Sequence, residues 1–337
     1  MLLGNLSVEV GRNHAPHGHA REYGPVMSHN PRGLDMIRLS MERPGRFPWI
    51  FRHLGPVGVS AYVADMGRDQ DIPGSKLFVF EGAIRPHRNL ELGGALLNHQ
   101  LGEGAPDAEW HQRVRDILFI VHRRPFYIFP PVGGEFSDKV MAADARLTLP
   151  GQGIELYAEV ASTDDHGMFD AAYEALWTEA AWTWGVRASG LGDEGRLDLW
   201  AEAGRNGVRP YTHHQFTSGM TVDRRVIGSP LGPLGTGFQG GVDWTDGSQT
   251  ISWNAAWERY SGDNYGDGVD KSYLDWVRLA DNPDEVRIRT TLDWTRQAAL
   301  SGLRTTVRLG YEHVTRFDFT DRNRSNFLAQ VGVGYVW

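Results

Sequence analysis

The stretch FLAQVGVGYVW, residues 327–337, decides the fold. Its apolar side chains fall on every second position from Phe327 to Trp337, with Gln330, Gly332 and Gly334 between them. A period of two is typical of a β-strand with one apolar face. The same alternation recurs upstream, for example in residues 284–296 and 302–318, where the other face carries charged residues and threonines. The chain is therefore predicted to consist largely of long, two-faced strands.

Composition excludes several classes of protein. The chain has 337 residues, 34 Lys plus Arg, 42 Asp plus Glu and no Cys. Its longest apolar run, residues 117–121, falls far short of the roughly 18 residues that a membrane-spanning helix needs. A net charge of −8 without a concentrated basic stripe argues against nucleic acid as a partner. The absence of Cys excludes disulfides and thiol nucleophiles.

Fourteen strands are expected from the alternation. They span residues 3–11, 34–42, 56–66, 76–87, 89–100, 137–149, 153–163, 179–191, 195–206, 236–245, 248–260, 284–296, 302–318 and 326–337.

Two architectures share this pattern, a soluble sandwich and a transmembrane barrel. Strands of about 9 to 13 residues match a tilted membrane crossing better than the five or six usual in soluble sheets. Many apolar faces end in Trp or Tyr, which is typical of the aromatic girdles of barrels. Length and aromatics both favour a transmembrane antiparallel up-and-down β-barrel.

The connections alternate between long and short, as in outer-membrane barrels with long extracellular loops and short periplasmic turns. This alternation requires residues 211–221 to belong to one long excursion, and segment 43–55 is its only exception. The long connections are 12–33, 67–75, 101–136, 164–178, 207–235, 261–283 and 319–325.

Segment 101–136 contains the one helical pattern. Its apolar residues Trp110, Val114, Ile117, Leu118 and Val121 recur at three- or four-residue spacing. We expect a short helix here that folds into or across the mouth of the barrel. If this segment packs as a plug, the barrel should not conduct ions, whereas a porin should. Conductance therefore distinguishes the two functions.

A series of ordered blocks resembles the Wzi family of outer-membrane capsule assembly proteins. The most similar is ADARLTLP at 143–150, followed by ELYAE at 155–159. Ser229 stands where the family pattern leads us to expect His, so no role of that His is carried over. The other blocks are VEVGR at 8–12, YGP at 23–25, MSHNP at 27–31, FEGAIRP at 80–86, LELG at 90–93, DD at 164–165, YTHH at 211–214, SG at 218–219 and VIGSPLG at 226–232.

The resemblance implies an eighteen-stranded barrel with a periplasmic helical segment that binds capsular polysaccharide at the cell surface. Residues 1–337 would then form a single barrel domain that lacks about four N-terminal strands, the helical segment and the signal peptide. The implied protein is an outer-membrane, lectin-like monomer without catalysis or cofactor. Its partners would be capsular or other exported polysaccharide, outer-membrane lipid and the barrel-assembly machinery.

Polysaccharide binding needs polar groups for sugar hydroxyls and aromatic faces for sugar rings. Arginines would suit an acidic polymer, because the guanidinium pairs with carboxylates through two hydrogen bonds. Asp144, Arg146, Tyr157 and Glu159 point inward by alternation, and for them a cross-strand ladder that fixes strand register is the competing interpretation. The candidates are Arg12, Asn30, Arg85, Asp144, Arg146, Tyr157, Glu159, Asp165, Arg224 and Arg225.

Other clusters suggest chemistry less strongly. His14, His17, His19 and Glu22 are metal-binding residue types, but a loop with Pro16 and Gly18 offers no fixed scaffold, so we expect a solvated loop and no metal. His213, His214 and Ser218 would suit a barrel hydrolase, yet no nucleophile-elbow context surrounds them. Adjacent acids Asp164 and Asp165 splay apart and cannot flank one glycosidic bond.

Phe327, Tyr335 and Trp337 form the C-terminal signature by which outer-membrane barrels are assembled. A passive porin remains the main alternative function.

Overall fold

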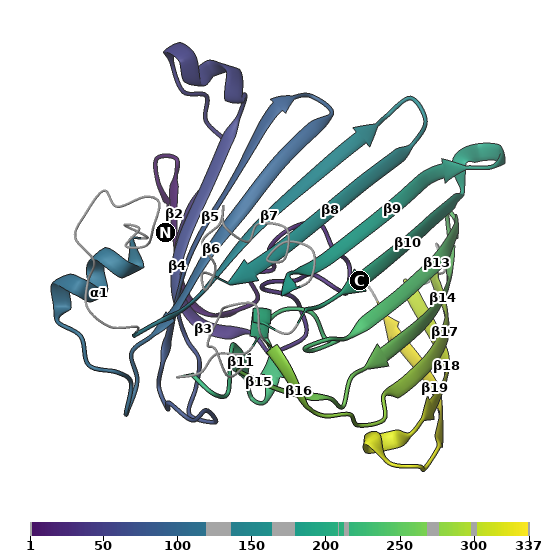
Figure 1. Ribbon diagram of the computed structural model, residues 1–337. Helices are drawn as coiled ribbons and strands as arrows, with labels where there is room; N and C mark the ends of the chain where they lie inside the picture. The colour runs from purple at the N-terminus through teal and green to yellow at the C-terminus, as the bar shows by residue number, and fades with distance from the viewer. Residues whose placement is uncertain are drawn as a thin grey trace.

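The computed structural model describes residues 2–118, 136–163, 179–207, 209–211, 216–267, 276–297 and 302–335. One antiparallel sheet contains β1 (Leu2–Leu3) and fourteen longer strands. Each long strand pairs with the long strands that precede and follow it in the sequence. The sheet curls around a lumen (Figure 1), but no ladder among the described residues joins β19 to β1 or β2, so the barrel is not closed. The long strands are β2 (Leu6–Asn13), β3 (Leu34–Met41), β4 (Val57–Asp65), β5 (Lys76–His87), β6 (Leu90–Gln100), β7 (Asp138–Leu149), β8 (Ile154–Thr163), β9 (Ala181–Leu191), β10 (Leu197–Arg205), β13 (Thr236–Asp246), β14 (Gln249–Tyr260), β17 (Glu285–Gln297), β18 (Leu303–Thr315) and β19 (Arg324–Tyr335).

These strands confirm the fourteen predicted ones, with ends that differ by a few residues. The first predicted strand is broken, because the chain turns at Gly4 (φ 66°) and pairs β1 back onto β2. The excursion 207–235 is confirmed as a connection between β10 and β13, and it contains the hairpin of β11 (Thr221–Val222) and β12 (Arg225–Val226). A second small hairpin, β15 (Asn264–Asp267) with β16 (Trp276–Ala280), lies in the connection 261–283.

The helical segments within the described ranges are short. They are α1 (Trp110–Ile117) and the 3-10 turns η1 (Trp49–Leu54), η3 (Asp193–Gly195), η4 (Arg209–Tyr211) and η5 (Phe317–Phe319). None of the helices in the described ranges is both long enough and apolar enough to cross a membrane.

The outer face of the sheet is apolar and exposed, as alternation predicts. Val10, Ile37, Phe238 and Val331 each leave half or more of their surface uncovered. Trp182 and Trp184 stack on this face with ring centroids 5.6 Å apart. Exposed apolar area on this scale is unfavourable in water and suits a lipid environment.

The lumen is packed by two connections from the end of the sheet that carries the long connections, which we call the extracellular end. We call them the N-terminal loop, residues 14–33, and the central loop, the described part of residues 206–235. Val26 and Met27 of the first and Met220 and Ile227 of the second pack with Leu77 and other inward residues of β3 to β8 in one buried cluster. Figure 1 shows these segments inside the curve of the sheet. An apolar core therefore forms inside the lumen.

Helix α1 confirms the predicted helix, but it lies outside the lumen. Asp116 accepts a hydrogen bond from Asn98 Nδ2 at 2.7 Å and pairs with Lys139 Nζ at 2.7 Å. Asn98 and Lys139 alternate with His99 and Val140, which face inward, so both belong to the outer face of the sheet. The helix therefore does not fold into the mouth. Residues 119–135 of the same segment are outside the described ranges.

Candidate functional site at the extracellular rim and in the lumen

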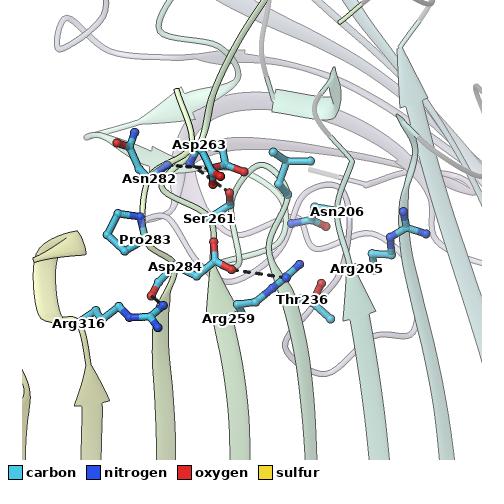
Figure 2. A pocket seen from close by; sticks show the side chains of 12 residues that line it. Arg205, Asn206, Thr236, Arg259, Ser261, Asp263, Asn282, Pro283, Asp284 and Arg316 are labelled. Atoms are coloured by element: carbon cyan, nitrogen blue, oxygen red, sulfur yellow. Dashed lines mark hydrogen bonds and ion pairs between the residues drawn. The ribbon is translucent and has the colours of Figure 1, made fainter. Parts of the chain in front are cut away.

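A polar cleft of about 390 Å³ lies at the extracellular ends of β10, β13, β14 and β17 (Figure 2). Arg259 Nη1 lies 3.5 Å from Asp284 Oδ2, and Arg316 donates to the backbone oxygen of Asp284 at 3.3 Å. The backbone N–H of Asn282 donates to Asp263 Oδ1 at 3.0 Å. These contacts hold guanidinium, carboxylate and amide groups around one concave surface. Such groups pair with sugar hydroxyls.

A second cleft, of about 520 Å³, lies between the connection 67–75 and the central loop. Gln70 joins its two sides, because its side-chain amide donates to the backbone oxygens of Met66 and Thr221. Arg224 sits in the β11–β12 turn, where it and Asp223 both have positive φ, as a two-residue hairpin turn requires. The cleft is lined by Arg68, Asp69, Gln70, Asp71, Ser218, Thr221 and Arg224.

Two other predicted site residues join the two loops to each other. Asn30 Nδ2 donates to the backbone oxygen of Val226 at 2.8 Å, and Arg225 Nη1 donates to the backbone oxygen of Asn30 at 3.3 Å. Ser229 is completely buried nearby, and its backbone N–H donates to Tyr211 Oη at 3.1 Å. The two loops together form what we call the extracellular cap. Asn30 and Arg225 stabilise it by hydrogen bonds from one loop to the other.

Below the cap, three inward glutamates hold residues 19–23 of the N-terminal loop. Glu202, on β10, accepts the backbone N–H groups of Arg21, Glu22 and Tyr23 at 2.6, 3.0 and 2.8 Å, and the Tyr157 hydroxyl at 2.6 Å. Its exposed fraction is 1%. A buried carboxylate is tolerated when its oxygens are fully hydrogen-bonded, and Glu202 meets this condition.

The other two glutamates hold the same segment on either side, Glu159 through the loop backbone and Glu258 through a side chain. Glu159, on β8, accepts the backbone N–H groups of His19 and Ala20. Glu258, on β14, accepts the Tyr23 hydroxyl at 3.1 Å and pairs with Arg289. The lumen wall therefore holds the N-terminal loop through its backbone and through the side chain of Tyr23.

His17 and His19 correct the prediction of a solvated loop. His17 Nε2 lies 3.1 Å from Asp144 Oδ2 and His19 Nε2 lies 3.1 Å from Asp144 Oδ1, while Glu81 lies 3.7 Å from the other nitrogen of His17. Burial by itself would lower the pKa of His17, but hydrogen bonding and charge attraction from Asp144 and Glu81 outweigh it and raise that pKa to about 9. In the part of the chain that is described, no group of three or more His, Cys, Asp or Glu residues is arranged to hold a metal ion.

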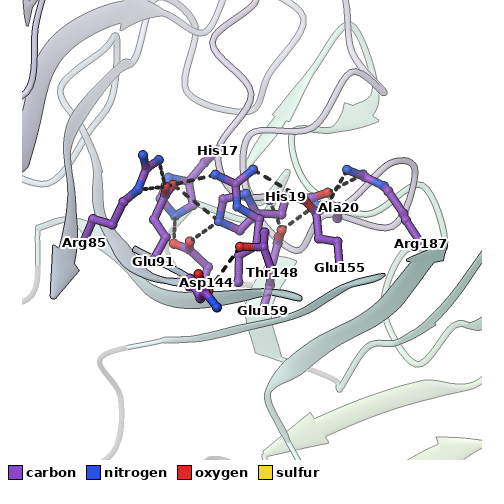
Figure 3. A network of polar contacts seen from close by, with 12 residues as sticks. His17, His19, Ala20, Arg85, Glu91, Asp144, Thr148, Glu155, Glu159 and Arg187 are labelled. Atoms are coloured by element: carbon purple, nitrogen blue, oxygen red, sulfur yellow. Dashed lines mark hydrogen bonds and ion pairs between the residues drawn. The ribbon is translucent and has the colours of Figure 1, made fainter. Parts of the chain in front are cut away.

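A ladder of alternating charges crosses the inner wall from β5 to β9 near the periplasmic ends of these strands (Figure 3). Arg85 pairs with Glu91, and Arg146 bridges Glu91 at 3.0 Å and Glu155 at 3.7 Å. Arg187 continues the series by pairing with Glu155 at 2.8 Å. This arrangement is the cross-strand ladder that competes with a binding role for Arg146.

The predicted site residues therefore do not form a single site. Asn30, Arg224 and Arg225 lie in the cap, whereas Asp144, Arg146, Tyr157 and Glu159 lie in the lumen wall as alternation predicts. Arg85 lies near the periplasmic end, and Arg12 pairs with Asp35 at 2.6 Å on the exposed outer face. Asp165, Trp337, His213 and His214 fall outside the described residues. Phe327 and Tyr335 are exposed on β19, and their role in assembly stays a prediction.

Comparison with known proteins gives one family match. The model of the capsule assembly protein Wzi family matches residues 1–328. The chain belongs to the Wzi family. The match confirms the predicted family, and with it the predicted role in capsule assembly and location in the outer membrane. No curated protein matches this chain.

Among solved structures, Wzi of Escherichia coli superimposes with a TM-score of 0.72 at 16% identity, covering 98% of this chain and 68% of its own. That protein is described as an outer-membrane, carbohydrate-binding β-barrel involved in group 1 capsule assembly. The similarity confirms the barrel-type fold of this Wzi family member. OccAB3 of Acinetobacter baumannii scores 0.43 at 11% identity over 94% of this chain and 85% of its own, too low to carry an argument.

Proposed function

We propose that this Wzi family member binds exported polysaccharide at its extracellular cap and retains the polymer at the cell surface without catalysis. One observation carries the proposal. The lumen is filled by the N-terminal and central loops, while polar clefts of about 390 and 520 Å³ open where the long connections meet. A barrel that is packed inside and polar at its outer mouth suits holding a polymer better than passing a solute. The carbohydrate binding described for Escherichia coli Wzi supports the same proposal.

The charged groups of the clefts indicate how a polymer would be held. Arg68 and Arg224 stand in one cleft with Asp69 and Asp71, so guanidinium groups can pair with sugar carboxylates while acidic oxygens accept hydroxyl protons. We include Arg224 from the predicted set and add Arg68. Ser218 lines this cleft, while His213 and His214 lie outside the described residues.

Retention of polymer tests the proposal. Cells that lack the protein should shed capsular polymer, and the wild-type chain should restore it. The variant Arg68→Gln with Arg224→Gln should restore it only in part, because two charge-assisted contacts to the polymer are lost. Arg296→Gln with Arg304→Gln removes the same charge at the periplasmic end and serves as the matched control. Full retention by the cleft variant would exclude this cleft, and unchanged retention after deletion would overturn the function.

Conductance tests the porin alternative. The packed loops predict no stable conductance in planar bilayers, whereas large stable conductance would favour a porin. The full chain, as purified, is the sample for this measurement.

A further inference from the structure

A strongly basic pocket lies at the periplasmic end, opposite the cap. It has a volume of about 460 Å³ and lies between the connection from β3 to β4 and the turn from β5 to β6. The residues around it include no Asp or Glu. Its ionisable lining consists of Arg46, Arg52, His53, Arg85, His87 and Arg88.

Most of this positive charge is uncompensated. Arg85 pairs with Glu91, but Arg46, Arg52 and Arg88 make no ion pair with any residue in the described ranges. The rim cleft differs, because its arginines face three aspartates. Several guanidinium groups around one concavity repel one another unless an anion sits between them, and they pair with phosphate through two hydrogen bonds each.

The same connection exposes a cluster of large apolar side chains. Phe47, Trp49, Ile50 and Phe51 have exposed fractions of 48%, 81%, 61% and 54%. They lie in and beside η1, which projects beyond the neighbouring turns as the dark blue coil of Figure 1. Residues 43–55 are also the one exception to the short periplasmic turns. Exposed apolar groups of this size are unfavourable in water.

The apolar cluster continues the lipid-facing surface of the barrel. Ile37 and Leu39 on β3 and Val59 on β4 are exposed on the outer face, and the connection between these two strands carries the cluster. Aromatic residues beside arginines are typical of the boundary between acyl chains and headgroups. Apolar and basic groups therefore stand together at the level where headgroups lie.

We propose that the connection 42–56 is an interfacial anchor that binds the headgroup of an anionic phospholipid. Arg46, Arg52 and Arg88 contact the phosphate in the basic pocket. Trp49 and Ile50 enter the adjoining acyl region. This site is independent of the polysaccharide clefts, which lie at the other end of the strands.

Depth in the membrane tests the apolar half of the proposal. Because the chain has no Cys, Ile50→Cys gives a single position for an environment-sensitive fluorophore. In the full chain reconstituted into phosphatidylglycerol-containing vesicles, the label should emit at the wavelength of a membrane interface and be quenched by spin-labelled lipid. A label at Glu103, in an extracellular connection, is the control that stays in water. Emission from Ile50→Cys that matches this control would overturn the anchor.

Lipid selectivity tests the basic half. Spin-labelled phosphatidylglycerol should quench the label several-fold more than spin-labelled phosphatidylcholine. Arg46→Gln with Arg52→Gln and Arg88→Gln should bring the ratio of quenching by the two lipids close to one, since each basic residue near the surface attracts anionic lipid. Arg296→Gln with Arg304→Gln should leave it unchanged. In the labelled Ile50→Cys chain that keeps all of its arginines, high salt should weaken the preference for phosphatidylglycerol. This measurement does not depend on the folding of the triple variant. Equal quenching by the two lipids would overturn the headgroup site, and so would a preference that salt does not change.

Discussion

Two parts of the same sheet face the lumen in different ways. In the packed half, β3 to β14, the inner face is covered by the N-terminal and central loops, and the side chain of Asp144 is only 5% exposed. In the open half, β17 to β19, the inward pair Arg308 and Asp293 is 53% and 27% exposed. Both halves share the alternation of charged and apolar residues. What differs is the presence of a loop that supplies hydrogen-bond donors to the wall.

The comparison teaches that one charged strand pattern serves two physical purposes. In the open half, water solvates the charges and each ion pair contributes little. In the packed half, carboxylates are buried and become fixed partners of loop backbone, so losing one leaves several groups unsatisfied. The same substitution should therefore have very different effects in the two halves.

The largest effect is expected from Glu202→Ala. The change leaves three backbone N–H groups and the Tyr157 hydroxyl without their acceptor, and this should lower the free energy of unfolding by about 3–5 kcal/mol. Urea titration of the reconstituted chain measures it, and faster trypsin cleavage at Arg21 reports release of the loop. Asp293→Ala in the open half is the matched control, with an expected loss below about 1 kcal/mol. Equal losses would show that the loop does not depend on the wall.

The next effect is a pH dependence confined to the packed half. The pKa of His17 is raised from 6.5 to about 9, so folding takes up a proton there. The stabilisation is complete below pH 6.5 and is lost as the pH rises through 9, a change on the order of 3 kcal/mol. Unfolding free energies measured across this range should decline, and His17→Gln should flatten the curve.

His313→Gln supplies the control for this pH profile. His313 lies in the exposed part of β18 and contacts the Ser325 hydroxyl at 2.9 Å. Its replacement should leave the decline intact. A decline that persists in His17→Gln would assign the titration to another group.

A smaller effect is expected at Gly18. Its φ of +84° is unfavourable for other residues, and a Cβ there would overlap the Glu159 carboxylate. Gly18→Ala should therefore cost about 1–2 kcal/mol for the backbone conformation alone. At Gly310, on β18, a Cβ would meet Leu328 Cβ at an ordinary 3.4 Å, so Gly310→Ala should change stability by less than about 0.5 kcal/mol. If Gly18→Ala lowered stability as little as Gly310→Ala, the loop would tolerate a shift of Glu159.

The strands of the barrel wall could be predicted well from the sequence, whereas the packing of the loops inside the lumen could not. Strand alternation follows from local geometry, so the period of two located all fourteen long strands and the inward direction of Asp144, Arg146, Tyr157 and Glu159. The partners of these residues come from far along the chain, as with Glu202 and the backbone of Arg21, 181 positions apart. No local pattern encodes such a contact. His17 was misread for this reason, because a loop with Pro and Gly has the same composition whether it is solvated or packed against a wall.

The smallest effect should come from the Asp293–Arg308 pair. Arg308 Nε lies 2.5 Å from Asp293 Oδ1 between paired positions of β17 and β18, but both side chains reach solvent. A double-mutant cycle with Asp293→Asn and Arg308→Gln should give a coupling of about 0.2–1 kcal/mol that falls in high salt. Urea titrations of the four chains measure it. A coupling above about 2 kcal/mol, insensitive to salt, would mean that this half is desolvated like the packed half. The difference in hydration between the two halves would then no longer hold.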